Sequence, residues 1–254
     1  RFPERCVPPL CLAYSPTLLL KLNFNMLQLP DSLENATQQA IAATFTAIDE
    51  GCKRLMVDMR FLELKPLPIA RYFAEALQAR YGQAWQALFA DAGSAALAKR
   101  DWSDLDVSMR GVNEGRAAIR PEDEAFLLVA PSSIEVDRVE KLLQLAGDRP
   151  FILLNPRLEN SEVGLGLSAR KMRDRFLATF EVSYYVQSLE QGALWRCYPQ
   201  PWQVWQQGES DMHMLVEIDR RPSGDDLERM FMKATGKQSS LLLRMQQLFN
   251  ALGR

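Results

Sequence analysis

Continuously apolar segments alternate with amphipathic segments between residues 31 and 180, and this alternation limits the fold more than any other feature. The apolar segments include AFLLV at residues 125–129 and FILLN at residues 151–155. Such short, fully apolar runs are typical of strands that are buried on both faces of a sheet. The pattern predicts an α/β fold, Rossmann-like, with a mostly parallel sheet flanked by helices. The sequence does not determine the strand order.

Capping residues indicate where the helices begin and end. The first helix has Asp31 or Ser32 as its N-cap and Gly51 as its C-terminal stop. Helices are predicted at residues 31–51, 68–82, 93–101, 134–147 and 168–180, and strands at residues 55–61, 85–91, 125–133 and 151–155.

After residue 180 the helical periodicity stops, and β-rich runs are separated by turn signals at EQG, PQP and GESD. We expect a β-meander of about four antiparallel strands over residues 181–222. Two C-terminal helices are expected within residues 223–254. Residues 26–254 are therefore expected to form a single α/β domain, with its parallel part at residues 26–180. Residues 1–25, which precede Met26, are expected to be a poorly ordered lead or a gene-model extension.

Composition excludes several classes of function. The formal net charge of −2 argues against a nucleic-acid binder, which usually carries a basic excess. Four cysteines without a CxxC pair and a single His213 do not form a zinc motif, so no metal is expected. The sequence has neither GxGxxG nor a GxxxxGK[ST] phosphate loop, so no cofactor is expected. No apolar run is long enough for a transmembrane segment.

Two strand-to-helix junctions are weak candidates for ligand binding. Asp91 and Ser94 follow a predicted strand at its carboxyl end, where open α/β sheets bind ligands, or they cap the next helix. Gly164 and Gly166 open the helix of residues 168–180, where helix amides, Arg170 and Lys171 are candidates to hold an anion. The alternative is a structural loop. The same basic helix is a candidate for peripheral contact with acidic lipids or an acidic protein, or it is a solvated face.

A catalytic cysteine is disfavoured. His213 is the only histidine of the chain, Cys197 is its only plausible thiol partner, and no neighbouring residue marks the thiol as activated. We therefore expect no catalytic residue.

The segment GALWRCYPQPWQVWQQ, residues 192–207, is predicted to form a hairpin with two different faces. In the simplest register one face forms a core seam of Trp195, Cys197, Trp202 and Val204. The other face then carries Arg196, Tyr198, Gln203 and Trp205. Arg, Tyr and Trp are enriched at protein interfaces, so Arg196, Tyr198 and Trp205 are candidates for partner binding. The alternatives are core throughout, or a register shift of one residue that exchanges the faces.

Several segments together resemble a known family. They are LPDSLENATQQAIAAT, GCKRLMVDMRFLELKP, LFADAGSAALAKRDW, NPRLENSEVGLGLSARKMRDRFL and LWRCYPQPWQVW, within residues 27–250. The chain is similar to a cyanobacterial and chloroplast domain of unknown function. In plants this family includes a stromal assembly factor for photosystem II accumulation, and the domain is also fused to a chloroplast adenylate kinase. The resemblance implies no catalytic residue.

Two functions follow as hypotheses. The resemblance implies a non-catalytic protein that binds photosystem II subunits in the cyanobacterial cytoplasm or the chloroplast stroma, peripheral to thylakoids. The α/β pattern instead favours an enzyme or sensor that binds a small molecule or nucleotide phosphate at the carboxyl ends of the parallel strands.

Overall fold

The computed structural model describes residues 28–61, 63–114, 119–158, 176–208 and 211–234. The expected lead at residues 1–25 and the last predicted helix lie outside the described residues. The helices are α2 (Leu33–Asp49), α3 (Pro66–Tyr81), α4 (Ala92–Asp101), α5 (Val136–Ala146) and α7 (Gly224–Ala234), with 3-10 turns η1 (Ser133–Glu135) and η2 (Leu177–Thr179). The strands are β1 (Arg54–Arg60), β2 (Trp85–Phe89), β3 (Ser108–Gly111), β4 (Ala125–Val129), β5 (Phe151–Leu154), β6 (Glu181–Leu189), β7 (Gly192–Cys197), β8 (Trp202–Gln207) and β9 (Met212–Ile218).

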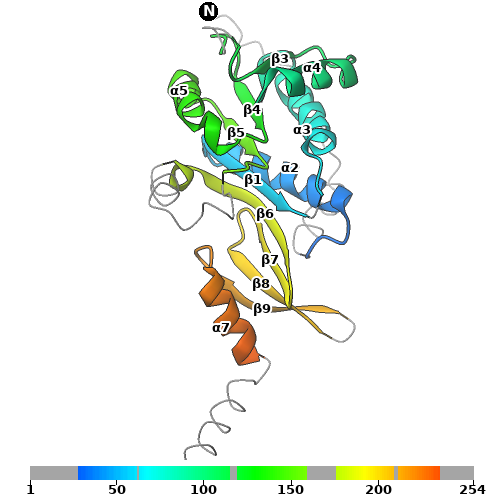
Figure 1. Cartoon of the computed structure of the whole chain (residues 1–254), viewed down its shortest axis with the longest axis vertical. Coiled ribbons are helices and arrows are strands. Elements are labelled where there is room, and N and C mark those ends of the chain that lie inside the picture. The colour runs from blue at the N-terminus through cyan, green and yellow to red at the C-terminus, as the bar shows by residue number, and fades with distance from the viewer. Residues whose placement is uncertain (1–27, 62, 115–118, 159–175, 209–210, 235–254) are drawn as a thin grey trace, which may run out of the picture.

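All nine strands form one continuous sheet in the order β3-β2-β4-β5-β1-β6-β7-β8-β9 (Figure 1). The strands from β3 to β6 pair in parallel, and β6 to β9 pair antiparallel. Strand β6 therefore belongs to both halves and joins the meander to the parallel sheet. The predicted fold class, a mostly parallel α/β sheet followed by an antiparallel meander and a C-terminal helix, is confirmed.

The first helix shows how sequence produces this packing. Ser32 caps α2 by accepting a hydrogen bond from the backbone N–H of Asn35 at 3.1 Å. One face of the helix is made of small side chains that are fully buried: Ala36, Ala40, Ala43 and Ala47. Alanine combines high helix propensity with a short side chain, so the helix axis lies close to the sheet. Helix α2 packs on β1, β6 and β7.

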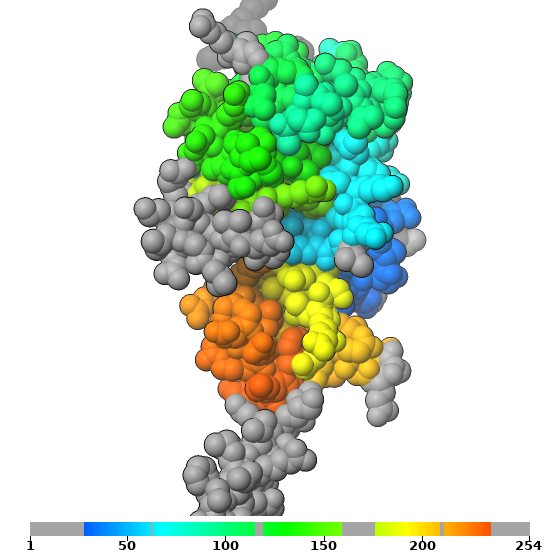
Figure 2. Space-filling view, viewed as in Figure 1, coloured from blue at the N-terminus to red at the C-terminus, as the bar shows by residue number. Residues whose placement is uncertain are grey.

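The sheet has a hydrophobic core on each face. On the first face α2, α3 and α4 cover a core that extends from Met109 on β3 to Trp195 on β7. On the second face α5 covers the parallel strands and α7 covers the antiparallel strands. The two second-face clusters meet at Val182, which packs against both. Figure 2 shows α7 lying over the antiparallel strands.

The hairpin of β7 and β8 has a different register from the one expected. Trp195 pairs with Gln203 and Ala193 pairs with Trp205, so Trp195 and Trp205 lie on the same face. Their rings meet edge to face, with centroids 6.3 Å apart. Trp202 instead lies on the second face. The turn is closed by the Gln200 N–H, which donates to the Cys197 carbonyl at 3.0 Å, and this closure shifts the pairing by one residue.

Two further differences from the sequence predictions concern short elements. Strand β3 was not predicted, because it has only four residues and includes the polar Ser108 and Arg110. Residues 177–179 form a 3-10 turn instead of the end of the helix predicted at residues 168–180. Phe176 and Phe180 both pack into the second-face core, with ring centroids 5.2 Å apart, and the chain is extended from residue 181. Residues 168–175 lie outside the described part of the chain.

Candidate functional site

The carboxyl ends of β1 and β5 form a topological switch point. These two strands are parallel neighbours. After β1 the chain enters α3, which packs on the first face, whereas Leu158, just after β5, packs into the core of the second face. Connections that leave adjacent strands toward opposite faces create a crevice at the sheet edge, and open α/β sheets bind ligands there.

Asn155 shapes the edge at this point. Its backbone has a φ of 47°, in the left-handed region that asparagine tolerates better than most residues. Its Oδ1 accepts a hydrogen bond from the Met59 N–H at 3.0 Å and so replaces a backbone carbonyl of the ladder. The Nδ2 is buried and has no hydrogen-bond partner among the residues that the structure describes. Asn155 thus ends the β1–β5 pairing and turns the chain toward Arg157.

The end of β4 repeats this geometry. Ala130 has a φ of 49°, which is unusual for a residue with a Cβ, and it is also followed by a proline. The Arg157 N–H donates to the Pro131 carbonyl at 2.7 Å, so the two bent segments run side by side beyond the strands. Strained backbone of this kind concentrates at functional sites, and here it marks two adjacent strand ends.

A cleft of about 580 Å³ lies beside these strand ends, within the range of small-molecule sites. Its wall is mostly apolar, and four charged side chains also line it. The lining residues are Leu64, Lys65, Pro66, Leu67, Pro68, Arg71, Asp101, Trp102 and Arg157. Residues after β1 and after β5 therefore meet in one cleft.

The charges of the cleft divide into paired and unpaired groups. Arg71 is bound by Glu75 at 2.7 Å and by both oxygens of Asp104, and these partners raise its pKa. Asp101 is paired with Arg100 at 2.7 Å. Within the described residues, no carboxylate pairs with the other two cations, Lys65 and Arg157.

The predicted ligand residues Asp91 and Ser94 lie at the carboxyl end of β2, as expected, but not in this cleft. Asp91 caps α4: its Oδ1 accepts from the Ser94 N–H and its Oδ2 from the Ser94 hydroxyl, both at 2.8 Å. These hydrogen bonds lower the pKa of Asp91. The other ligand candidates, Gly164, Gly166, Arg170 and Lys171, lie outside the described residues.

The three predicted partner residues are not on one face. Arg196 lies on the second face, where it pairs with Glu181 and stacks over Trp202 with its Cζ 5.6 Å from the ring centroid. Tyr198 donates its hydroxyl hydrogen to Glu50, at the end of α2. Trp205 is half-buried on the first face, and its Nε1 donates to Gln203 Oε1 at 3.1 Å. The expectation that Arg196, Tyr198, Gln203 and Trp205 share one face is wrong, because the observed register places Arg196 and Trp205 on different faces of the sheet.

Trp205 has a different exposed neighbour. A β-bulge between Val204 and Trp205 pairs Trp205 with Met214, which is 46 % exposed. Leu215 is the extra residue of the bulge and packs on the second face. We call the first-face group of Trp205, Met212 and Met214 the Trp205 surface.

The family model of a domain of unknown function, DUF1995, matches residues 30–229. The chain belongs to the DUF1995 family. The matched residues include every strand of the sheet, the cleft and the Trp205 surface. Family membership therefore confirms the resemblance at the level of a domain of unknown function.

In the described part of this DUF1995 chain, Cys197 and His213 do not lie on neighbouring strands. Cys197 is buried, and burial raises the pKa of its thiol to about 12. His213 lies on β9, and β8 separates that strand from β7. Among the described residues no group of three His, Cys, Asp or Glu side chains is arranged to hold a metal ion. No described helix has the length and apolarity to cross a membrane.

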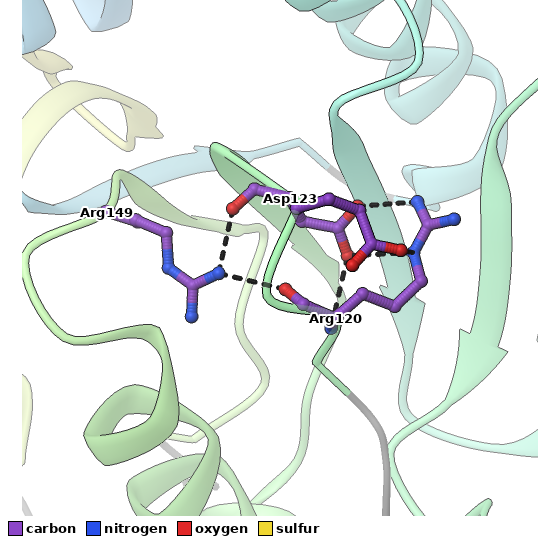
Figure 3. Close-up of polar contacts among 4 residues, drawn as sticks. Arg120, Asp123 and Arg149 are labelled. Atoms are coloured by element: carbon purple, nitrogen blue, oxygen red, sulfur yellow. Dashed lines mark hydrogen bonds and ion pairs between the residues drawn. The ribbon is translucent and has the colours of Figure 1, made fainter.

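Arg120, Asp123 and Arg149 form a charged cluster around the buried Asp123 side chain (Figure 3). Asp123, whose side chain is fully buried, pairs with Arg120 Nη2 at 2.5 Å. Arg149 Nη1 donates to the carbonyls of Arg120 and Asp123 at 3.0 and 2.8 Å. Its other nitrogens donate to Leu145 and Ala146, the last two residues of α5. Arg149 thus satisfies carbonyls that a helix end leaves unpaired and fixes the loop before β4.

Proposed function

We propose that this DUF1995 protein is a non-catalytic binding protein that assists the assembly or stability of photosystem II. It acts in the cytoplasm of a cyanobacterium or in the chloroplast stroma, peripheral to thylakoids. The observation that carries the proposal is the Trp205 surface beside the open edge of β9. The sequence resemblance to a family with a photosystem II assembly factor supplies the partner.

The edge of β9 supports binding of an extended segment. Strand β9 is last in the sheet order and, among the described strands, pairs only with β8. An open strand edge presents unpaired N–H and C=O groups that a partner strand can join. Met214 and Trp205 stand next to this edge, and side chains of the added strand would pack on them.

The side chains of the Trp205 surface suit recognition. Tryptophan and methionine are enriched at protein interfaces, and methionine adapts its shape to a partner. Glu217 continues the same face and is exposed, so it provides a polar rim; its carboxylate accepts a hydrogen bond of 2.7 Å from the buried Gln203 side chain. An apolar centre with a polar rim is the usual arrangement of a binding interface.

Affinity capture from thylakoid extracts tests the proposal. The tagged wild-type protein is expected to recover photosystem II subunits after crosslinking. Met214→Glu places a charge in the surface at a side chain that is 46 % exposed, and it is expected to lower that recovery about tenfold or more. Leu97→Glu is a matched control, because Leu97 is 43 % exposed on α4. Absence of photosystem II subunits from the wild-type capture, with normal photosystem II in a deletion strain, would contradict the proposal.

A second candidate function is small-molecule binding at the carboxyl ends of the parallel strands. The cleft that Lys65 and Arg157 line favours it.

A further inference from the structure

We infer that the cleft beside the ends of β1 and β5 binds an anionic small molecule that has an apolar body and a carboxylate or phosphate head. The inference gives the second candidate function a ligand class. It does not depend on the Trp205 surface or on a protein partner.

Two cations of the cleft are available to an anionic ligand. Of its four charged side chains, Arg71 and Asp101 are neutralised by neighbours within the protein. Lys65, just after β1, and Arg157, just after β5, have no acidic partner among the described residues, and both line the cleft. A carboxylate or phosphate placed between them would receive charge-assisted hydrogen bonds, and the Arg157 guanidinium is suited to bidentate contact.

Side chains, and not helix amides, must supply these hydrogen bonds. Helix α3 begins at the cleft, but Pro66 and Pro68 have no N–H, and Lys65 makes no side-chain cap. A helix N-terminus with so few free donors is a poor anion site. Specificity for the anionic head therefore depends on Lys65 and Arg157.

The wall of the cleft selects the rest of the ligand. Leu64, Leu67 and the two prolines form one apolar side. Trp102, whose ring packs against Phe89 with centroids 5.7 Å apart, adds an aromatic group from the end of α4. These residues would bury a hydrocarbon or aromatic body, while the two cations hold its head. A free inorganic anion would leave this apolar wall exposed to water.

The position of the cleft agrees with the fold. It lies at the switch point of β1 and β5, where parallel α/β sheets bind ligands. The left-handed backbone of Asn155 directs the chain to Arg157. The Arg157 N–H donates a hydrogen bond to the Pro131 carbonyl, and this bond fixes the backbone from which the Arg157 side chain extends.

Calorimetric titration with three probes tests the inference. The probes are 1-naphthyl phosphate, which has head and body, 1-naphthol, which has only the body, and inorganic phosphate, which has only the head. Naphthyl phosphate is expected to bind wild-type protein at least about tenfold more tightly than either of the other two, because one charged hydrogen bond contributes about that factor. A 1-naphthol affinity equal to that of naphthyl phosphate would overturn the anionic assignment. Equal binding of inorganic phosphate would overturn the apolar body.

Variants locate the site. Arg157→Met and Lys65→Met are each expected to weaken naphthyl phosphate binding about tenfold to a hundredfold. Arg138→Met is the matched control, since Arg138 is an exposed cation on α5 without an acidic partner in the described residues. All three side chains are exposed, so circular dichroism is expected to show an unchanged fold. No heat of binding in the wild type, or equal weakening by Arg138→Met, would refute the site. Neither outcome alters the capture of photosystem II subunits.

Discussion

Replacement of the two tryptophans that meet across β7 and β8 tests the observed register of the hairpin. Trp195 is only 1 % exposed and is among the largest fully buried side chains, so Trp195→Ala is expected to lower the free energy of unfolding by about 3–5 kcal/mol. Trp205 is half-buried. Its replacement by alanine removes part of its buried area and one edge-to-face contact, an expected loss of about 1.5–3 kcal/mol.

The double variant distinguishes the two registers. Because the rings of Trp195 and Trp205 touch, the double variant is expected to lose about 0.5–1.5 kcal/mol less than the sum of the single losses. In the register expected from sequence the two side chains lie on opposite faces and the losses add. The free energies come from guanidinium unfolding followed by far-ultraviolet circular dichroism. Additivity within about 0.3 kcal/mol would refute the register. The cycle of Trp195 with Trp202, which lie on opposite faces, is the control and is expected to be additive.

Two further predictions concern polar groups. Asp91→Ala removes the cap of α4 and is expected to lower the free energy of unfolding by about 1 kcal/mol at pH 7. Folding lowers the pKa of Asp91. The stabilisation by the cap is therefore complete above the ordinary pKa of the carboxyl group and is lost as the pH falls through the lowered pKa. Asp91→Asn keeps a capping oxygen, so thermal unfolding of this variant at pH 2–7 is expected to lack that pH dependence, and identical pH profiles of all three proteins would contradict the role. Asp123→Ala leaves Arg120 without its buried carboxylate and is expected to cost about 2–4 kcal/mol in chemical unfolding. The exposed Asp101→Ala control is expected to show no change, and a loss for Asp123→Ala no larger than that of the control would contradict the structural role of the cluster.

The sequence predicted those elements whose signal is local. The apolar runs of β4 and β5 and the caps of α2 need only neighbouring residues, and the structure has them. Strand β3 has no such signal, because a short edge strand with Ser108 and Arg110 resembles a loop. The hairpin register depends on how the turn at Cys197 and Gln200 closes, and a shift of one residue exchanges the faces.

The cleft was missed for a different reason. Lys65 and Arg157 are 92 positions apart in the chain, the difference between 157 and 65. They line one cleft because β5 lies beside β1 in the sheet order, and the sequence does not determine that order. One sequence pattern nevertheless occurs twice: a proline follows an apolar strand after one intervening residue, at Ala130-Pro131 and at Asn155-Pro156. In the structure both positions are left-handed, and Asn155 marks the end of β5, after which Arg157 lines the cleft.

The most direct test of the proposed function is photo-crosslinking from position 214 of the full chain in thylakoid extract. A photoreactive amino acid at position 214 would lie on the Trp205 surface, beside the open edge of β9. The proposal predicts crosslinks to photosystem II subunits from position 214 and none from position 97 on α4. Crosslinks to those subunits at equal yield from both positions, or from neither, would contradict binding through the Trp205 surface.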